Sequence, residues 1–317
     1  MAMRADDLID RRRLRRKLTF WRVVAFLVLA AAVIGFSSWV YRGDFTGQAV
    51  DHIAKVRIEG TITEDEELIK RLEAIRKSPR VKGVILSVDS PGGTTVGGES
   101  IYEEVRKVAG DKPVVAEVGT LAASAGYMIA SAADHIVARK TSIVGSIGVL
   151  IQYPDVSGLM DKLGIKLEEV KSSPLKAAPS PFKPTNDDER AMVRKLILDS
   201  YDWFVGIVAE RRKMTHEQAL ALADGSIFTG RQGVANGLVD AVGGETEAID
   251  WLKSKGVDGK LQVVEWKDTD RSGFLFSKSM TRAIASALGL PDAGGDIIHE
   301  LGADRLFLDG LVSVWHP

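Results

Sequence analysis

The chain has 317 residues, of which 45% are hydrophobic and 27% are charged, and its formal net charge is -1. This balance is typical of a folded protein and argues against a basic nucleic-acid-binding surface, so no nucleic acid is expected as a partner. The chain contains no cysteine, which excludes disulfides, thiolate nucleophiles and cysteine-ligated metals. Its length allows one large domain or two small ones.

The amino-terminal part is predicted to anchor the chain in a membrane. A basic cluster between Arg11 and Lys17 precedes Val23 to Tyr41, a run of 19 residues without a charge, and a bilayer span needs about 20 apolar residues. Because basic flanks stay in the cytoplasm, we expect a cytoplasmic segment 1–19, a transmembrane helix 20–41 and a linker 42–52. A cleaved signal peptide is the alternative, but its apolar region usually has ~7–15 residues and ends in a small-x-small site.

Strands and helices are predicted to alternate from residue 53. Period-2 alternation or short buried runs indicate strands, and apolar spacing of three to four residues indicates helices. The strands are expected at 53–62, 81–89, 112–119 and 135–138, with helices at 64–77 and 99–109. This order predicts an α/β domain with crossover connections.

The second part of this domain, which ends near residue 268, is predicted from Asp155 onward. It comprises a short helix, a strand-like stretch 165–172, a Pro-rich loop 173–184, a helix 187–213 behind Asn186, a short helix behind Thr215, and a strand 261–268. Residues 269–317 form a tail that we do not assign to the core. Its apolar end, 307–317, could pack on a neighbouring subunit, contact the membrane surface or occupy a substrate groove, and simple packing is the expectation.

The segment DSPGGTTVGG, Asp89 to Gly98, follows a predicted buried strand. Glycines permit close approach of another backbone, and a Gly-Gly turn before a helix can direct backbone N–H groups at an anion. The alternative is an ordinary strand-to-helix turn, because Gly-rich turns commonly connect strands and helices.

Ser124 stands where the strand ending at Gly119 gives way to the helix-like stretch SAGYMIASA. A hydroxyl near a helix N-terminus is placed where the helix dipole stabilises developing negative charge. The alternative is that Ser124 simply caps the helix. The G-x-S-x-G motif of the α/β-hydrolases is absent.

A serine nucleophile needs a base, and none of the five histidines is marked as one by its position. Lys176 lies in the loop KSSPLKAAPSPF, which contains no acidic residue. Apolar surroundings disfavour the charged ammonium, and a neutral amine can accept the serine proton. A solvated surface lysine is the alternative.

Five segments together resemble the signal peptide peptidase A family, the membrane-bound Ser-Lys peptidases with a ClpP/crotonase-like α/β fold. They are VDSPGG, AASAGYMIA, TSIVGSIGVL, KAAPSPF and FTGRQGVANGLVDAVGG, which occur in the family's order between residue 53 and about residue 265. The resemblance therefore covers roughly two-thirds of the chain, and five motifs in register are far more specific than any one of them.

The resemblance implies a role for each site residue. Ser124 would be the nucleophile and Lys176 the general base, and Ser146 would hydrogen-bond and orient the lysine amine. The backbone N–H groups of Gly93 and Ala125 would form the oxyanion hole. The family often has Gly after the nucleophile and Ser after the lysine, where this chain has Ala125 and Ala177; neither departure removes a catalytic group.

The function expected from this resemblance is a serine endopeptidase, without a metal or organic cofactor, that degrades released signal peptides and similar apolar peptides. It would be a single-pass protein of the bacterial inner membrane with its peptidase domain outside the cytoplasm. The short form of the family implies a ring-like homo-oligomer, possibly an octamer, with serine and lysine contributed by adjacent subunits. There are two alternatives. One is a crotonase-like acyl-CoA enzyme, in which Glu99 or Glu117 would supply the carboxylate. The other is an inactive membrane scaffold.

Overall fold

The structure is a computed structural model that describes residues 17–18, 20–33, 48–267 and 312–314. It divides into two units, Met1–His52 and Ile53–Pro317. In the first unit residues 20–33 are helical. None of the helices in the described ranges has the length and apolarity required to cross a membrane. Residues 34–41 of the predicted transmembrane helix, and its basic flank before Lys17, lie outside the described residues.

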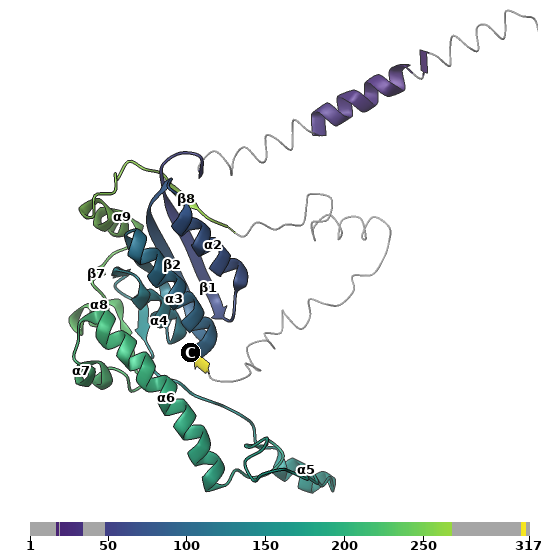
Figure 1. The fold of residues 1–317 in the computed structure, drawn as a ribbon, viewed down its shortest axis with the longest axis vertical. Coiled ribbons are helices and arrows are strands. Elements are labelled where there is room, and N and C mark those ends of the chain that lie inside the picture. Colours follow the sequence, from purple (N-terminus) through teal and green to yellow (C-terminus); the bar gives the residue numbers. More distant parts are fainter. Residues whose placement is uncertain (1–16, 19, 34–47, 268–311, 315–317) are drawn as a thin grey trace, which may run out of the picture. The chain divides into compact units, whose positions relative to one another are not determined.

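The second unit is built on a mixed β-sheet whose main path runs β6-β5-β3-β2-β1-β8 (Figure 1). Strand β4 pairs with β3 and β7, and β9 pairs with β2. The strands are β1 His52–Ile62, β2 Val81–Thr94, β3 Val114–Ala123, β4 His135–Ala138, β5 Ile143–Gly145, β6 Ile227–Thr229, β7 Ala241–Val242, β8 Val263–Glu265 and β9 Val312–Val314. The pairings β5–β6 and β2–β9 are antiparallel, whereas β2–β3, β3–β4 and β3–β5 are parallel.

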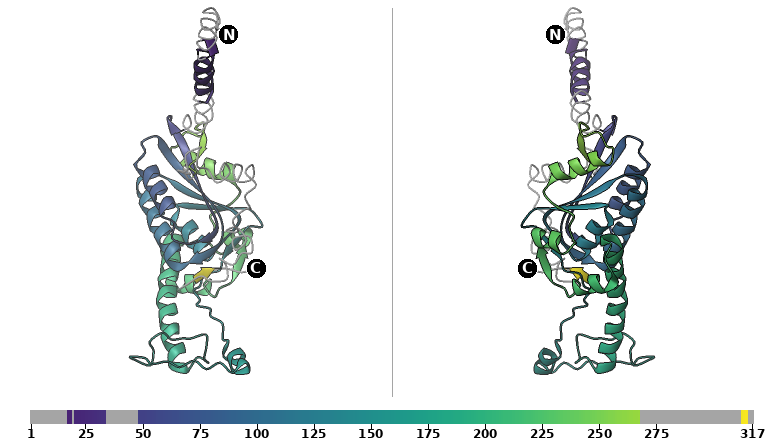
Figure 2. Two further views of the ribbon diagram at one scale, coloured as in Figure 1. Left: turned by 90° about the vertical axis from the view of Figure 1, so that its right-hand side faces the viewer. Right: turned by 90° about the vertical axis from the view of Figure 1, so that its left-hand side faces the viewer.

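Helices cover both faces of the sheet. They are α2 Glu66–Lys77, α3 Thr95–Asp111, α4 Ala125–Ala132, α5 Ser157–Leu163, α6 Asp187–Arg212, α7 His216–Ala221, α8 Gly230–Ala235 and α9 Glu245–Ser254. The sheet residues alternate between two cores: Val84 and Leu86 join the core beneath α2, α3 and α4, whereas Ile85 joins the core beneath α9. This is the period of two expected of a strand buried on both faces. The predicted α/β class is confirmed (Figure 2).

The two residues predicted to precede helices, Asn186 and Thr215, are N-caps in the structure. Asn186 accepts from the backbone N–H of Glu189 at 2.9 Å, and Glu189 accepts in return from that of Asn186. Thr215 and Gln218 form the same reciprocal pair. Such capping boxes satisfy two N–H groups that a helix start leaves without intrahelical partners.

Two local predictions were wrong. Residues 165–172 form no strand; no strand of the described sheet pairs with them, and Val170 is fully exposed. The segment Pro91–Thr94 is not a turn after the strand but part of it, because β2 runs to Thr94. The backbone of the Gly-Gly segment is therefore available for strand pairing.

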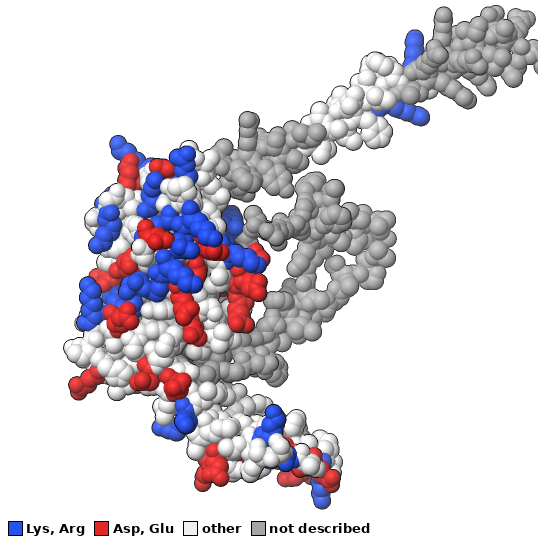
Figure 3. Space-filling model, viewed as in Figure 1, with Lys and Arg blue, Asp and Glu red and all other residues white. Residues whose placement is uncertain are grey.

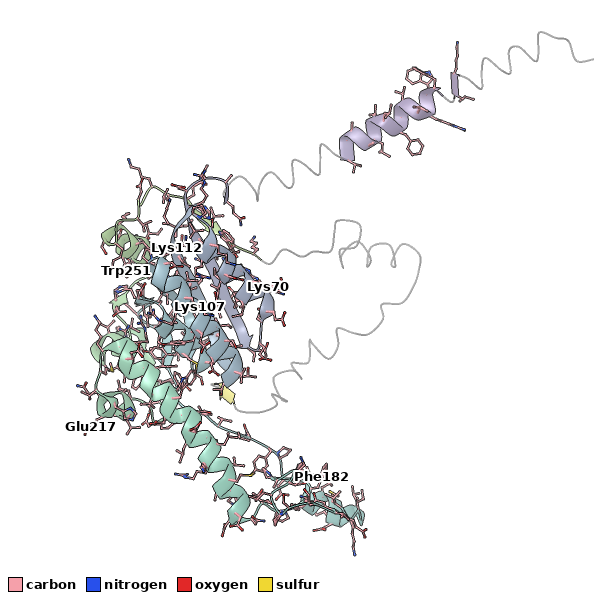
Figure 4. The ribbon with its side chains drawn as sticks, viewed as in Figure 1. Lys70, Lys107, Lys112, Phe182, Glu217 and Trp251 are labelled. Atoms are coloured by element: carbon pink, nitrogen blue, oxygen red, sulfur yellow. The ribbon has the colours of Figure 1, made fainter. Side chains whose placement is uncertain are left out.

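Helix α6 divides into two halves. Its second half packs into the main core through Phe204, Val205 and Val208, all fully buried. Its first half projects from the domain, with α5 and the loop 164–186 at the far end (Figures 1 and 2). We call residues 151–198 the arm. Phe182, which Figure 4 labels in this region, is 48% exposed.

Acidic and basic side chains alternate on the face that α2 and α3 cover (Figure 3). Lys70 pairs with Glu66 and Glu67, and Lys107 pairs with Glu104. The two Lys70 pairs are exposed, and exposed pairs contribute little to stability, about 0–1 kcal/mol each. The Glu104 side chain is buried. Because positive and negative side chains are interspersed, this face has no electrostatic potential of a single sign.

Candidate active site

Ser124 occupies a sharp junction between β3 and α4. Its side chain makes no capping hydrogen bond to the helix, so the capping alternative is wrong. The residue is 1% exposed and has φ 58° and ψ −122°. A non-glycine residue with positive φ costs on the order of 1–3 kcal/mol, and such residues gather at functional sites. Its backbone fits the strained strand-to-helix turn that presents nucleophiles in other folds.

Hydrogen bonds from the main chain keep Ser124 in this conformation. Its N–H donates to the carbonyl of Gly145 at 2.8 Å, and its own carbonyl accepts from the N–H of Met128 at 2.9 Å. The first bond ties the junction to β5 and the second begins α4. The backbone of Ser124, and with it the direction of its Cα–Cβ bond, is therefore held by two neighbouring elements.

The structure brings Ser146 next to this junction. Ala123 and Gly145, the last residues of β3 and β5, are partners in this parallel pair. Ser124 and Ser146 directly follow them and so lie side by side at the ends of the two strands. Ser146 also has a positive φ, 50°, and its N–H donates to the carbonyl of Ser226 at 2.8 Å. Both serines line one cavity of about 410 Å³.

The rest of this cavity, which we call the serine cavity, is mostly apolar. Its lining includes Ile147, Val149, Leu150, Ile197 and Leu198, with Tyr201, Ala223 and Asp224. The Tyr201 hydroxyl donates to the carbonyl of Ala223 at 2.7 Å. This hydrogen bond keeps the Tyr201 ring in place in the lining of the cavity. A cavity of this size and lining suits an apolar side chain of an extended ligand.

Asp224 is the acidic residue of the serine cavity, and it is a poor proton acceptor. Hydrogen bonds from the Ser226 side chain and backbone hold the pKa of Asp224 below its usual value. The Ser226 N–H lies 2.9 Å from a carboxylate oxygen of Asp224. The group stays ionised near neutral pH, and its low basicity disfavours it as a general base.

The Gly-Gly segment of β2 passes close to the same junction. At Gly93 a Cβ atom would overlap the backbone of Ile62, and at Gly126 it would lie 2.8 Å from the carbonyl oxygen of Ser90. Gly98 lies against the Ala125 side chain, where an added Cβ would be 3.0 Å away. The missing side chains allow β1, β2, α3 and α4 to meet here. Gly93 and Ala125, the two predicted oxyanion donors, therefore belong to adjoining elements.

Ser90 is a residue of this site that the sequence did not single out. It is fully buried, and its hydroxyl donates to the carbonyl of Gly60 at 2.6 Å while accepting from the N–H of Gly92 at 3.1 Å. Its own backbone packs against Gly126, two residues after Ser124. Its partners come from three separate segments, so no local pattern could have identified it.

Lys176 is not among the residues that line the serine cavity. It is exposed in the arm, where its backbone N–H donates to the carbonyl of Ser173 at 3.1 Å. The neighbouring residues Ser173, Pro174 and Leu175 face the first turns of α6, around Ala191 and Lys195. The serine cavity instead borders α6 near Ile197 and Tyr201. A single chain thus brings Ser124 and Ser146 together without Lys176.

No histidine of the described ranges lines the serine cavity. His135 stacks on Trp251 with a centroid distance of 5.1 Å and lies 3.6 Å from Asp240. Burial lowers the pKa of His135. Neither carboxylate of the acyl-CoA alternative, Glu99 or Glu117, lines the cavity, and Glu117 is 3.1 Å from Lys55 in an ion pair. Within the described part of the chain, no three His, Asp or Glu residues cluster as metal ligands.

Comparison with known proteins agrees with this architecture. The family model described as peptidase family S49 matches residues 106–258, and the model described as Clp protease matches residues 48–154. A putative signal peptide peptidase SppA of Enterococcus faecium is 34% identical over 245 residues, which cover 73% of this chain and 71% of that protein. The chain belongs to peptidase family S49, the signal peptide peptidase A family.

Two other relatives differ in how much of their length this chain matches. A putative protease of Methanocaldococcus jannaschii is 40% identical over 205 residues, covering 65% of this chain and 66% of the relative. Protease 4 of Haemophilus influenzae is 33% identical over 260 residues, but the match spans only 42% of that longer protein. The S49 chain therefore spans from under half to about seven-tenths of these three relatives.

Proposed function

We propose that this S49 chain is a serine endopeptidase in which Ser124 attacks the peptide carbonyl and Lys176 of a neighbouring copy is the general base. The observation that carries the proposal is the conformation of Ser124: buried, with positive φ, not used as a cap, and sharing an apolar cavity with Ser146. Membership of a peptidase family supports the same reaction class.

In the proposed first step the lysine amine, in its neutral form, accepts the proton of the Ser124 hydroxyl while the serine oxygen bonds to the substrate carbonyl carbon. The carbonyl oxygen becomes an oxyanion held by the N–H groups of Gly93 and Ala125. The lysine then delivers the proton to the leaving amine, and the acyl-enzyme forms. Water, deprotonated by the same amine, bonds to the acyl carbon of the acyl-enzyme. The bond from that carbon to the Ser124 oxygen then breaks, the amine returns the proton to this oxygen, and the acyl part leaves as a carboxylic acid. Ser146 orients the amine.

The exposed arm supports a second copy as the source of the lysine. Several of its apolar residues are at least 40% exposed: Leu159, Leu163, Ile165, Leu167, Val170, Leu175, Phe182, Leu196 and Leu198. Exposed apolar patches on soluble domains commonly mark protein interfaces. A ring in which each arm packs on the next domain would cover them and carry Lys176 to a neighbouring Ser124.

The proposed substrates are extended, apolar peptides such as released signal peptides. The apolar lining of the serine cavity supports side chains of that kind beside the cleaved bond. The proposed location is a bacterial inner membrane, where the amino-terminal segment, including residues 20–41, would be the anchor and the peptidase domain would lie outside the cytoplasm. The sequence of that segment carries this part of the proposal.

Labelling with a fluorophosphonate tests the nucleophile. We expect the full-length protein to gain one label per chain, mapped to Ser124 by mass spectrometry of its peptides, and Ser124→Ala to gain none. Ser131→Ala is the matched control, because Ser131 is equally buried on α4 but bonds to the carbonyl of Met128. Labelling of another serine, with Ser124 unmodified, would contradict the proposal.

A further inference from the structure

We infer that the serine cavity takes basic side chains as well as apolar ones, and that the carboxylate of Asp224 makes it reject acidic side chains. The inference rests on the proposed function, because it assigns a substrate class to the cavity of the proposed nucleophile. Among the described residues that line this cavity, Asp224 alone carries a charge.

The turn that carries Asp224 is tied to the cavity. The N–H of Ser226 donates to the Asp224 carboxylate at 2.9 Å, and the carbonyl of Ser226 accepts from the N–H of Ser146 at 2.8 Å. Between them Gly225 has φ 87°, a conformation that glycine adopts without strain. The carboxylate is therefore part of a fixed turn beside Ser146. Hydrogen bonds from the Ser226 side chain and backbone lower the pKa of Asp224, so it is negatively charged at neutral pH.

The charge of Asp224 acts on the cavity wall. Tyr201 lines the cavity, and its pKa is raised, first by burial and then by the negative charge of Asp224. A cleft lined by charge of one sign between apolar walls concentrates the field. A cation is therefore favoured in the serine cavity, and a second carboxylate is disfavoured.

A basic side chain matches both parts of this lining. Lys and Arg carry a charged head on an apolar stem of three or four methylene groups. The stem can pack on Ile197 and Leu198 while the head lies near Asp224. The proposed base, Lys176, is neutral when it accepts a proton, so it does not cancel the charge of Asp224 in the active form.

This selectivity suits the two parts of a released signal peptide. Such peptides have a positively charged segment followed by an apolar segment. A cavity that takes apolar and basic side chains allows cleavage within both segments. A cavity with apolar lining alone would leave the basic segment uncut.

Peptidyl-coumarin substrates test the selectivity, because their scissile bond is fixed. Three substrates differ only in the residue before the coumarin, which is Leu, Lys or Glu. An exposed pair of charges changes binding roughly 1.5- to 5-fold, and attraction of Lys and repulsion of Glu both enter the Lys-to-Glu ratio of kcat/KM. We expect Asp224→Asn to lower this ratio at least about threefold. Asn keeps a side-chain oxygen that can accept from the Ser226 N–H, so the turn is retained.

The control is Asp199→Asn, which removes the same charge from an exposed position of α6. Asp199 does not line the cavity. Because it is two residues from Tyr201, it lies about 200° around the helix from that lining residue. The Lys-to-Glu ratio of this variant should equal that of the wild type.

Two further measurements separate the inference from the peptidase reaction and from any fault in the variant. Labelled peptide amides of the same three sequences are titrated into chains carrying Ser124→Ala, with and without Asp224→Asn, and the Lys-to-Glu ratio of affinities should again fall at least about threefold. In chains with Asp224, raising the ionic strength from about 0.05 M to about 0.5 M should lower the ratio, because salt screens exposed charges.

A Lys-to-Glu ratio that is the same with Asp224 and with Asn at this position, or that does not respond to salt, would overturn the inference. Discrimination in binding that depends on Asp224, with no hydrolysis by any chain, would leave the inference standing and overturn the proposed reaction.

Discussion

The backbone N–H of Ser124 is hydrogen-bonded to the carbonyl of Gly145 at 2.8 Å. This bond joins the start of α4 to the end of β5 and so sets Ser124 beside Ser146. The strained backbone of one serine and the placement of the other depend on the same parallel strand pair. The two serines are thus placed by the ends of β3 and β5. The arm adds Ile197 and Leu198 to the lining of the serine cavity, but its residue Lys176 does not line that cavity.

Removal of the proposed base should abolish turnover without unfolding the domain. We expect Lys176→Ala to lower kcat by 10²–10⁴-fold, the usual worth of a positioned proton acceptor. Lys176→Arg should be equally impaired, because a guanidinium stays protonated. Lys166→Ala, another exposed lysine of the arm, is the control and should retain activity. Near wild-type turnover in Lys176→Ala would show that another group accepts the proton.

Ser90 is expected to act as a positioning residue for the Gly-Gly segment. Ser90→Ala removes the hydroxyl that joins Gly60 to Gly92, and loss of one oxyanion donor typically costs 10²–10³-fold in kcat. A shifted donor should cost less, and we expect a fall of about tenfold in kcat with little change in KM.

The control for Ser90 is Ser131→Ala, since both serines are buried and donate to a carbonyl at 2.6 Å. Both variants should lose on the order of 1 kcal/mol of unfolding free energy. Only Ser90→Ala should lower kcat. Equal kcat in the two variants would assign Ser90 a merely structural role.

Gly93 should tolerate no side chain. Gly93→Ala would drive a methyl group into the backbone of Ile62, so we expect lost activity and a clear loss of stability. Gly110→Ala is the control, because a Cβ there meets no atom within 4 Å and the residue lies in α3. It should raise stability by about 0.5–1 kcal/mol. Thermal unfolding and turnover of the two variants check both statements.

Asp240 should make the stability of the domain depend on acid pH. Burial acts to raise the pKa of Asp240, but hydrogen bonds and charge from Arg212 outweigh it and hold the pKa below its usual value. Arg212 makes two hydrogen bonds to this carboxylate, at 2.7 and 2.9 Å. A lowered folded-state pKa gives stability that is present above the unfolded pKa of about 3.9 and is lost as the pH falls through the folded-state pKa.

Asp240→Asn measures this contribution. At pH 7 we expect the variant to lose about 1–3 kcal/mol, the worth of a hydrogen bond to a charged group. The difference between wild type and variant should shrink below about pH 4. Denaturant unfolding at a series of pH values checks the sign. A difference that grew on acidification would contradict the ion pair as its source.

Local patterns in the sequence predicted most of the fold. The alternation of Val84, Ile85 and Leu86 between two cores, and the caps at Asn186 and Thr215, depend on residues near in sequence. The extension of β2 through Gly93 was missed because glycine has a low intrinsic preference for strands. Its strand state here is imposed by the pairing with β9 and the contact with Ile62.

The roles assigned to the site residues stay predictions. Ser124 and Ser146 lie together because both follow strands of one parallel pair, a placement that the sequence analysis did not state. The contacts of Ser90 with Gly60 and Gly126 join distant segments, and no spacing rule detects them. The position of Lys176 relative to a Ser124 hydroxyl depends on which surface packs on the apolar arm. The sequence of one chain does not specify that packing.

The most direct test of the account mixes two inactive variants. Ser124→Ala and Lys176→Ala proteins are denatured, combined in equal amounts and reassembled, and peptide hydrolysis is compared with that of each variant reassembled alone. If serine and lysine come from neighbouring copies in a ring, about a quarter of the mixed sites should regain both groups. Recovery near that fraction is the predicted result. No recovery from particles shown to contain both variants would contradict the shared Ser124–Lys176 site.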